Sequence, residues 1–203
     1  MSQSASDNTQ PAGLRALADA LADAVVVQHS LLVACAPVFG QITSAFVNTL
    51  TAGGRILLCG NGGSACDAQH VACELVGRFM RDRRPLPAMA LNCDGAVMTS
   101  LSNDFGYAHV FERQVMALAQ PRDVDVGIST SGNSSNVIRA VEAARTIGAV
   151  TVGFTGGSGG RIKDMVDICF RAPSEHTPRI QEAHLLVWHA VCDAVEAEIC
   201  LRG

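Results

Sequence analysis

The chain has 203 residues, of which 48% are hydrophobic, 17% charged and 4% aromatic, and its net charge is −4. This length fits one domain with a helical addition, and the apolar content argues against an intrinsically disordered protein. Apart from Arg81, Arg83 and Arg84 the basic residues are scattered, unlike the basic patch of a nucleic-acid-binding protein. We therefore expect no nucleic-acid partner. The low charge indicates a protein that hides surface in an oligomer.

The start of the chain and the cysteines indicate the cellular compartment of the protein. Residues 1–13 are polar and lack the pattern of a secretory signal, so we predict a disordered tail there. No stretch approaches ~18 consecutive apolar residues, so no membrane-spanning helix and no membrane partner are expected. The eight Cys form no C-x-x-C pair and mostly lie in apolar runs, which is typical of buried thiols in a reducing compartment. These features predict a cytoplasmic protein.

Helical periodicity dominates the first quarter of the chain. Apolar residues recur at helical spacing over 14–36, Pro37 interrupts the pattern, and a second helical stretch runs to Gly53 and Gly54. The sequence therefore predicts N-terminal helices over residues 14–54.

Strands and helices then alternate. We predict strands at 55–60, 88–92, 123–129, 150–155 and 167–172, and helices at 64–80, 94–102, 107–119, 134–147 and 178–201. Such alternation predicts an α/β domain over 55–203, with a five-stranded parallel sheet sandwiched by helices. Ligands bind such sheets beyond the carboxyl ends of the strands.

The loop after the first strand is Gly60-Asn61-Gly62-Gly63-Ser64. Its glycines allow a ligand to approach the backbone closely, and the following helix offers free N–H groups to an anion. The loop matches neither a dinucleotide-binding nor a Walker pattern. The alternative is an ordinary tight turn that Ser64 caps.

The loop after the third strand, Ser129-Thr130-Ser131-Gly132-Asn133-Ser134, is rich in hydroxyl groups and again opens a helix. Hydroxyl and backbone N–H donors can hold a phosphate without a Lys, although a polar capped turn would look similar. Together the two loops predict a small phosphorylated ligand. The segment Gly156–Gly160 is either a third wall or a flexible connection.

Two further groups contain histidine. His70 and Glu74 lie one helical turn apart, a spacing that suits metal binding or proton transfer but equally a surface contact. Asp67 and Gln69 read as exposed positions. His184 lies in an apolar helical pattern and reads as a core residue.

Four segments resemble the phosphoheptose isomerases, which convert sedoheptulose 7-phosphate within the sugar isomerase (SIS) fold: GNGGSACDAQHVACELVGRF, LSNDFGYAHVFERQV, DVGISTSGNSSNVIRAVEAA and TPRIQEAHLLVWHAVCDAVE. The resemblance implies a flavodoxin-like parallel sheet. It also implies a homotetramer with active sites near subunit interfaces. The implied reaction yields D-glycero-D-manno-heptose 7-phosphate, a precursor of the lipopolysaccharide core, through an enediol(ate).

The resemblance also implies roles for individual residues. Glu74 and His189 match the catalytic pair, and a zinc site reported for some members matches His70, Glu74, Gln181 and His189. The implied substrate contacts are Asn61, Gly62, Gly63, Ser64, Asn103, Asp104, Ser129, Thr130, Ser131, Ser134 and Gln181. Of these, the five hydroxyl residues are implied to hold the phosphate and Asp104 to contact a substrate hydroxyl. The segment PSEHTP before the last helix departs from the family pattern.

The geometry of a helix makes it difficult for all four implied ligands of one chain to bind the same zinc ion. Gln181 and His189 are eight residues apart, which is about 12 Å along a helix. Either the helix start deviates, or the two ligands come from different subunits. Zinc ligation would also compete with a role of Glu74 as a base, so the reaction runs either with metal or through residues alone.

A non-catalytic alternative exists within the same fold. The resemblance extends to scaffolds that bind the chromosomal replication initiator protein, which keep similar loops but lack the catalytic pair. Because Glu74 and His189 are both present, the sequence favours the enzyme. Fold alone does not decide between the two functions.

Overall fold

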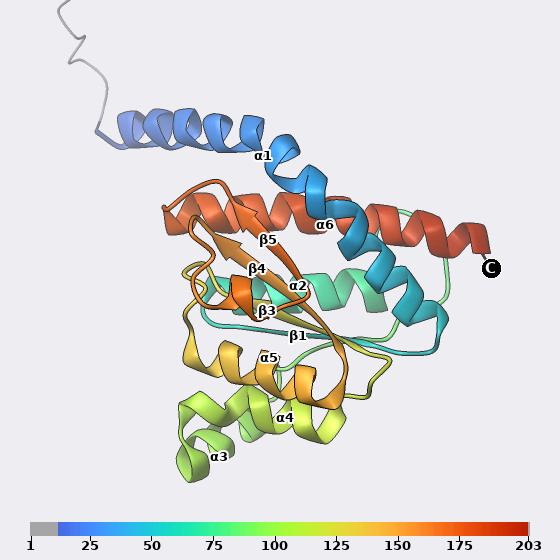
Figure 1. Cartoon of the computed structure of the whole chain (residues 1–203). Helices are drawn as coiled ribbons and strands as arrows, with labels where there is room; N and C mark the ends of the chain where they lie inside the picture. The colour runs from blue at the N-terminus through green and yellow to red at the C-terminus, as the bar shows by residue number, and fades with distance from the viewer. Residues whose placement is uncertain (1–11, 203) are drawn as a thin grey trace, which may run out of the picture.

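A computed structural model describes residues 12–202 (Figure 1). Of the tail predicted over 1–13, residues 1–11 lie outside the described residues, and residues 12 and 13 already belong to a helix. Helices and strands follow in the order α1 (Ala12–Thr51), β1 (Ile56–Gly60), α2 (Gly63–Val76), β2 (Ala88–Ala90), α3 (Gly95–Phe105), α4 (Val110–Leu118), β3 (Val124–Ile128), α5 (Ser135–Ile147), β4 (Val150–Gly156), β5 (Ile168–Ala172) and α6 (Thr177–Arg202). Short 3-10 turns lie at Tyr107–His109 and Ile162–Asp164.

The five strands form one parallel sheet in the order β2-β1-β3-β4-β5. This confirms the predicted fold class, because 2-1-3-4-5 is the flavodoxin-like order. The chain leaves β1 toward one edge and returns to β3 on its other side, so the topological switch point lies between β1 and β3. The two polar loops predicted to bind phosphate follow these two strands.

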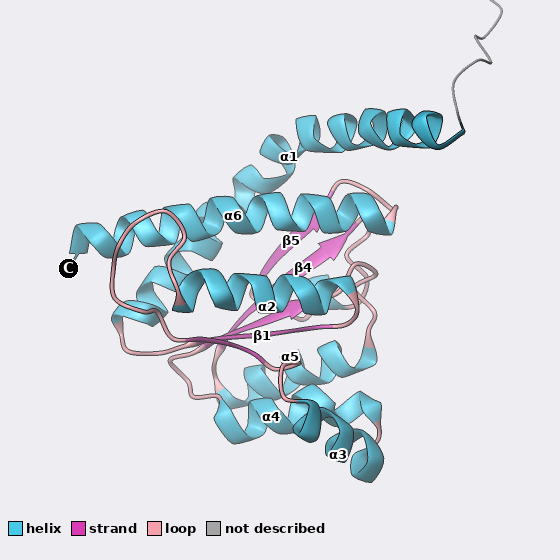
Figure 2. Cartoon of the chain, turned by 180° about the vertical axis from the view of Figure 1, so that it is seen from behind, coloured by secondary structure: helices cyan, strands magenta, loops and turns pink. Residues whose placement is uncertain are grey.

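Helices cover both faces of the sheet (Figures 1 and 2). One core lies under α1, α2 and α6, and its centre is Trp188, which stacks on Phe154 of β4 with ring centroids 3.8 Å apart. The other core lies under α4 and α5, with α3 packed against its margin. Every side chain of β1 and β3 is buried, as expected for a parallel sheet covered on both faces.

Helix α1 runs unbroken through Pro37, whereas the sequence predicted two helices separated there. Proline removes one backbone hydrogen bond and crowds the carbonyl four residues before it, which bends a helix without necessarily ending it. The ribbon changes direction within α1 (Figure 1). The second half packs into the core through Ile42, Phe46, Val47 and Leu50, and this packing keeps the helix intact.

The first half of α1 exposes apolar side chains. Leu17, Val26, Leu32 and Val33 are between 54% and 81% exposed. Residues Gly13–Thr51 are long and apolar enough to cross a membrane by length and composition, with 28% of the most apolar window buried. The core buries one face of the second half, whereas the first half leaves most of its apolar side chains exposed.

Helix α2 is shorter than predicted and ends at Val76 instead of continuing to residue 80. Gly77 follows it, and the backbone N–H groups of Phe79, Met80 and Arg81 donate to the Glu196 carboxylate on α6. These N–H groups are therefore unavailable for helical bonds. A long-range contact, which periodicity cannot show, ends the helix.

Candidate active site

The loop after β1 brings α2 against the start of α6. A Cβ atom on Gly63 would collide with the Gln181 side chain, so only glycine permits this contact. Ser64 is buried at the start of α2. Gly62 takes a positive φ of 56° and provides no side-chain cap, which leaves the N-terminus of α2 without a capping side chain.

The loop after β3 gathers three hydroxyl groups. The Ser129 Oγ lies 2.9 Å from the Ser134 Oγ and 3.5 Å from the Ser131 Oγ. Ser134 is the N-cap residue of α5 but makes no capping bond. A helix N-terminus with adjacent hydroxyl donors is suited to an anion. Gly132 has a φ of 65° and abuts Gly159 too closely for any side chain, so the loop 156–160 packs against this loop as a wall.

The two loops are joined across the switch point by a pair of amides. Asn61 and Asn136 exchange two hydrogen bonds of 2.9 Å each, and the Tyr107 hydroxyl donates to the Asn61 Oδ1 at 2.8 Å. Neither Asn136 nor Tyr107 was predicted from the sequence. An Asn in the first turn of a helix after a hydroxyl-rich loop was the available signal for Asn136.

The segment before Tyr107 carries two of the implied substrate contacts. Asn103 and Asp104 are exposed near the end of α3, and the Asn103 amide donates to the Asp104 carboxylate at 2.9 Å. Because Tyr107 bonds to Asn61, this segment lies beside the loop after β1.

A second group forms between α2 and α6. The His70 Nε2 lies 2.9 Å from the His189 Nε2 and 3.5 Å from the Glu74 Oε1. The Phe79 ring stacks on the His189 ring with centroids 5.5 Å apart. The structure thus brings together Glu74 and His189, the two residues that the sequence implied as catalytic, around His70.

The four implied zinc ligands do not meet within one chain. Helix α6 is continuous over Thr177–Arg202, so its start does not deviate. Gln181 packs against Gly63, whereas His189 packs against His70, seven residues further along α2. As the side chains lie, residues 12–202 contain no group of three His, Cys, Asp or Glu arranged for a metal ion. Imidazole and carboxylate donors nevertheless suit zinc.

Asp67 is buried, not exposed as the sequence predicted. It is 8% exposed on the inner side of α2, and its Oδ2 has no hydrogen-bond partner. Burial raises the pKa of this carboxyl to about 6, although the nearby His70 acts in the opposite direction. The residue one turn after Ser64 therefore adds an ionisable group beside the site.

His184 lies in the core, as predicted. Its Nε2 is 2.9 Å from the Thr155 carbonyl oxygen, and its ring meets Phe154 edge to face. Burial lowers the pKa of His184 to about 4, so the ring is neutral at neutral pH and takes no part in the site.

Comparisons with known proteins agree with this geometry. The SIS domain family matches residues 27–156. The phosphoheptose isomerase of Roseiflexus sp. (strain RS-1) is 51% identical over 178 residues, which cover 88% of this chain and 90% of that protein.

Two solved structures are similar to this chain in fold as well as in sequence. The phosphoheptose isomerase from Neisseria gonorrhoeae has a TM-score of 0.86 and 40% identity, and covers 91% of this chain and 98% of its own. The enzyme from Francisella tularensis has a TM-score of 0.89 and 36% identity, over 92% and 100% of the two chains. The chain therefore belongs to the SIS domain family and, within it, to the phosphoheptose isomerases, a group of sugar-phosphate isomerases.

Proposed function

We propose that the protein isomerises sedoheptulose 7-phosphate to D-glycero-D-manno-heptose 7-phosphate, a precursor of the lipopolysaccharide core, in the cytoplasm. The observation that carries this proposal is the meeting of Glu74 on α2 with His189 on α6, around His70. The glycine-rich start of α2 and the hydroxyl-rich start of α5, both at the switch point, supply the phosphate site. All eight Cys are free, which supports a reducing compartment.

The reaction moves one proton between two carbon atoms and further protons at the sugar oxygens. A ketose becomes an aldose when a base moves a proton between C2 and C1 through an enediol(ate) while an acid serves the oxygens. Glu74, whose side chain is 20% exposed, is the base at carbon. His189 exchanges protons with the sugar oxygens. The donors at the starts of α2 and α5 hold the phosphate.

Distances along α2 support a site shared between copies. Glu74 lies eleven residues after Gly63, which is about 16 Å along the helix at 1.5 Å per residue. About eight bonds separate C1 of the sugar from its phosphorus, or roughly 10 Å at the bond advance of an extended chain. Measured between backbone positions, C1 stops about 6 Å short of the same chain's Glu74, and we propose that a second copy contributes to the site.

The exposed half of α1 supports assembly. An apolar groove of about 460 Å³ lies between α1 and α6, and Leu31, Phe39 and Val187 are among its lining residues. The Arg179 guanidinium donates to the Ala20 carbonyl and holds the two helices together. A contiguous apolar surface of this kind typically marks an interface. We propose that a second copy covers it in a homotetramer.

Leu32→Glu is expected to dissociate the tetramer and to abolish most activity, because Leu32 is 81% exposed in one chain yet lies in the proposed interface. Light scattering after size exclusion measures the assembly. Leu201→Glu is the matched control, since Leu201 is 82% exposed at the far end of α6. A tetrameric, active Leu32→Glu would contradict the interface, as would a wild type that binds lipid vesicles through α1.

As the alternative to metal-free proton transfer by Glu74, we propose that His70, Glu74 and His189 bind zinc, which would polarise the sugar carbonyl as a Lewis acid. We expect about one zinc ion per chain by elemental analysis, and we expect His70→Ala to lose it. His176→Ala, at an exposed histidine before α6, should retain it. Equal zinc content in the two variants, or full activity after exhaustive chelation, would refute this site.

The test of the function is incubation of the wild-type protein with sedoheptulose 7-phosphate, followed by NMR for the anomeric proton of an aldoheptose phosphate. Formation of that signal supports the proposal. An inert tetramer that captures the chromosomal replication initiator protein would instead support the non-catalytic scaffold.

A further inference from the structure

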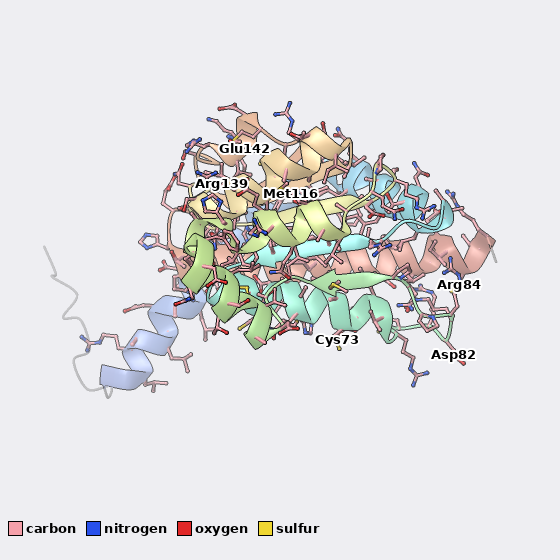
Figure 3. All side chains as sticks on the ribbon, turned by 90° about the horizontal axis from the view of Figure 1, so that it is seen from below. Cys73, Asp82, Arg84, Met116, Arg139 and Glu142 are labelled. Carbon is pink, nitrogen blue, oxygen red and sulfur yellow. The ribbon has the colours of Figure 1, made fainter. Side chains whose placement is uncertain are left out.

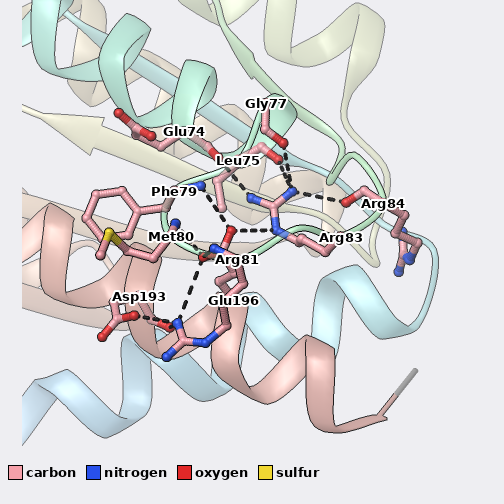
Figure 4. A network of polar contacts seen from close by, with 10 residues as sticks. All are labelled: Glu74, Leu75, Gly77, Phe79, Met80, Arg81, Arg83, Arg84, Asp193 and Glu196. Carbon is pink, nitrogen blue, oxygen red and sulfur yellow. Dashed lines mark hydrogen bonds and ion pairs between the residues drawn. The ribbon is translucent and has the colours of Figure 1, made fainter.

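A buried carboxylate lies on α6 about two turns beyond His189. Glu196 is 1% exposed and accepts hydrogen bonds from the backbone N–H groups of Phe79, Met80 and Arg81 at 3.0, 2.7 and 2.7 Å (Figure 4). Burial alone would raise the pKa of Glu196, but these three donors and the Arg83 guanidinium outweigh it, and the pKa is lowered. The carboxylate therefore stays ionised and fixes the turn after α2.

Arg83 is the counterion of this carboxylate. Its Nε lies 3.1 Å from the Glu196 Oε1, and its side chain is 4% exposed. The rest of the guanidinium donates to carbonyl oxygens at the end of α2 and in the turn, namely those of Glu74, Leu75, Gly77 and Arg84 (Figure 4). Arg83 thus supplies donors to carbonyl groups at the end of α2, where helical N–H partners run out.

The turn touches both members of the catalytic pair. Phe79, whose N–H donates to Glu196, stacks on His189 at an interplanar angle of 26°. The His70 ring lies at 63° to the His189 ring, with centroids 5.1 Å apart and the two Nε2 atoms 2.9 Å apart. At the other end, the Arg83 Nη2 donates to the Glu74 carbonyl at 2.9 Å.

We propose that Glu196, Arg83 and Phe79 are positioning residues for catalysis. The Glu196–Arg83 ion pair holds the turn 77–83, the turn places Phe79 against the His189 ring, and Arg83 fixes the backbone of Glu74. None of the three needs to touch the substrate. The inference rests on the proposed function, because it assigns the geometry of that site.

The physical reason is the sensitivity of proton transfer to geometry. A displacement of about 1 Å at a reacting group costs up to ~100-fold in rate. The His189 ring is half-buried and rotates about its own side-chain bonds unless packed on its faces. Phe79 stacks on the His189 ring and His70 contacts its Nε2, so both restrain the orientation of the ring. The phosphate loops lie at the other end of α2, so a change in the turn alters turnover without altering phosphate binding.

Phe79→Leu tests this directly. We expect kcat to fall about 10-fold or more with KM within about twofold of wild type, and Phe79→Tyr, which keeps the ring, to restore kcat. Arg83→Lys keeps a positive charge beside Glu196 but cannot donate to four carbonyl groups. It should likewise lower kcat and leave KM nearly unchanged. Thermal melting and light scattering confirm that each variant is folded and assembled.

Asp82→Asn is the matched control. Asp82 lies in the same turn, between Arg81 and Arg83, and its side chain is exposed. It should retain wild-type kcat. A folded Phe79→Leu and a folded Arg83→Lys with wild-type kcat would overturn the inference, as would a loss expressed in KM alone. A wild type without turnover would instead defeat the proposed function.

Discussion

Replacing Glu74 with Gln is expected to lower kcat by about 10²–10⁴-fold, the usual contribution of a general base. Gln has nearly the same shape and keeps the backbone contact between the Glu74 carbonyl and Arg83. It cannot accept a proton at neutral pH. The helix and the turn after it should therefore remain intact while proton abstraction stops.

Two measurements make this expectation specific. The first is turnover of sedoheptulose 7-phosphate by NMR. The second is exchange of the C1 proton with deuterium oxide, which requires only the base. His189→Ala should reduce turnover to a similar degree.

The control for Glu74→Gln is Glu198→Gln, because Glu198 is 50% exposed on α6 and pairs only loosely with Arg202 at 3.6 Å. It should behave as wild type. A Glu74→Gln variant within about threefold of wild type in both turnover and exchange would remove Glu74 from the mechanism.

The second large expected effect is on the pH dependence of folding stability, and it comes from Asp125 in the middle of β3. This residue is fully buried, and neither carboxylate oxygen has a hydrogen-bond partner. Its neighbours in the sheet are Leu57 of β1 and Thr151 of β4, and the Thr151 hydroxyl already donates to Asp167. Burial raises the pKa of Asp125 from 3.8 to about 7.

The sign of the pH effect follows from this raised pKa. The folded protein binds more protons than the unfolded chain between pH 3.8 and about 7, so Asp125 makes the free energy of unfolding fall as pH rises through this window. At 1.36 kcal/mol per unit, the loss above pH 7 is about 4 kcal/mol. His184, with its pKa lowered to about 4, acts in the opposite direction, so only a difference between variants isolates Asp125.

Asp125→Asn is therefore expected to be more stable than wild type at pH 8 by several kcal/mol, with a much smaller difference at pH 4.5. Urea unfolding at fixed protein concentration measures both values, since assembly contributes to stability. Asp82→Asn is the control, because Asp82 is exposed in the turn after α2 (Figure 3). A stability difference that does not change with pH would contradict the prediction.

The order of elements was predictable because parallel strands buried on both faces are apolar runs bounded by glycine. All five strands lie where the sequence placed them, to within two residues at their ends. The loops after β1 and β3 also meet as expected, because the carboxyl ends of neighbouring parallel strands share one edge. The order of the strands within the sheet depends on which strands pair with each other, and the local sequence pattern does not contain this information.

The helix ends and the burial of polar residues were less predictable. Pro37 predicted a break in the first helix, but the packing of Phe46 and its neighbours in the core keeps that helix continuous. Helix α2 ends early because the backbone N–H groups of residues 79–81 donate to Glu196, which is more than a hundred residues away in the sequence. Asp67 reads as exposed from its residue type, yet its side of the helix faces inward.

The sequence by itself determined the class of fold and singled out the two polar loops after β1 and β3, because these depend on local pattern and residue chemistry. The resemblance to the phosphoheptose isomerases supplied the candidates Glu74 and His189. Only the tertiary structure decided that His70, Glu74 and His189 meet, that Gln181 lies beside Gly63 instead, and that Phe79 and Glu196 support the pair. The physical reason is that α2 and α6 pack side by side over their whole shared length. Contacts between helices that distant in sequence are set by burial of the whole core and not by local periodicity.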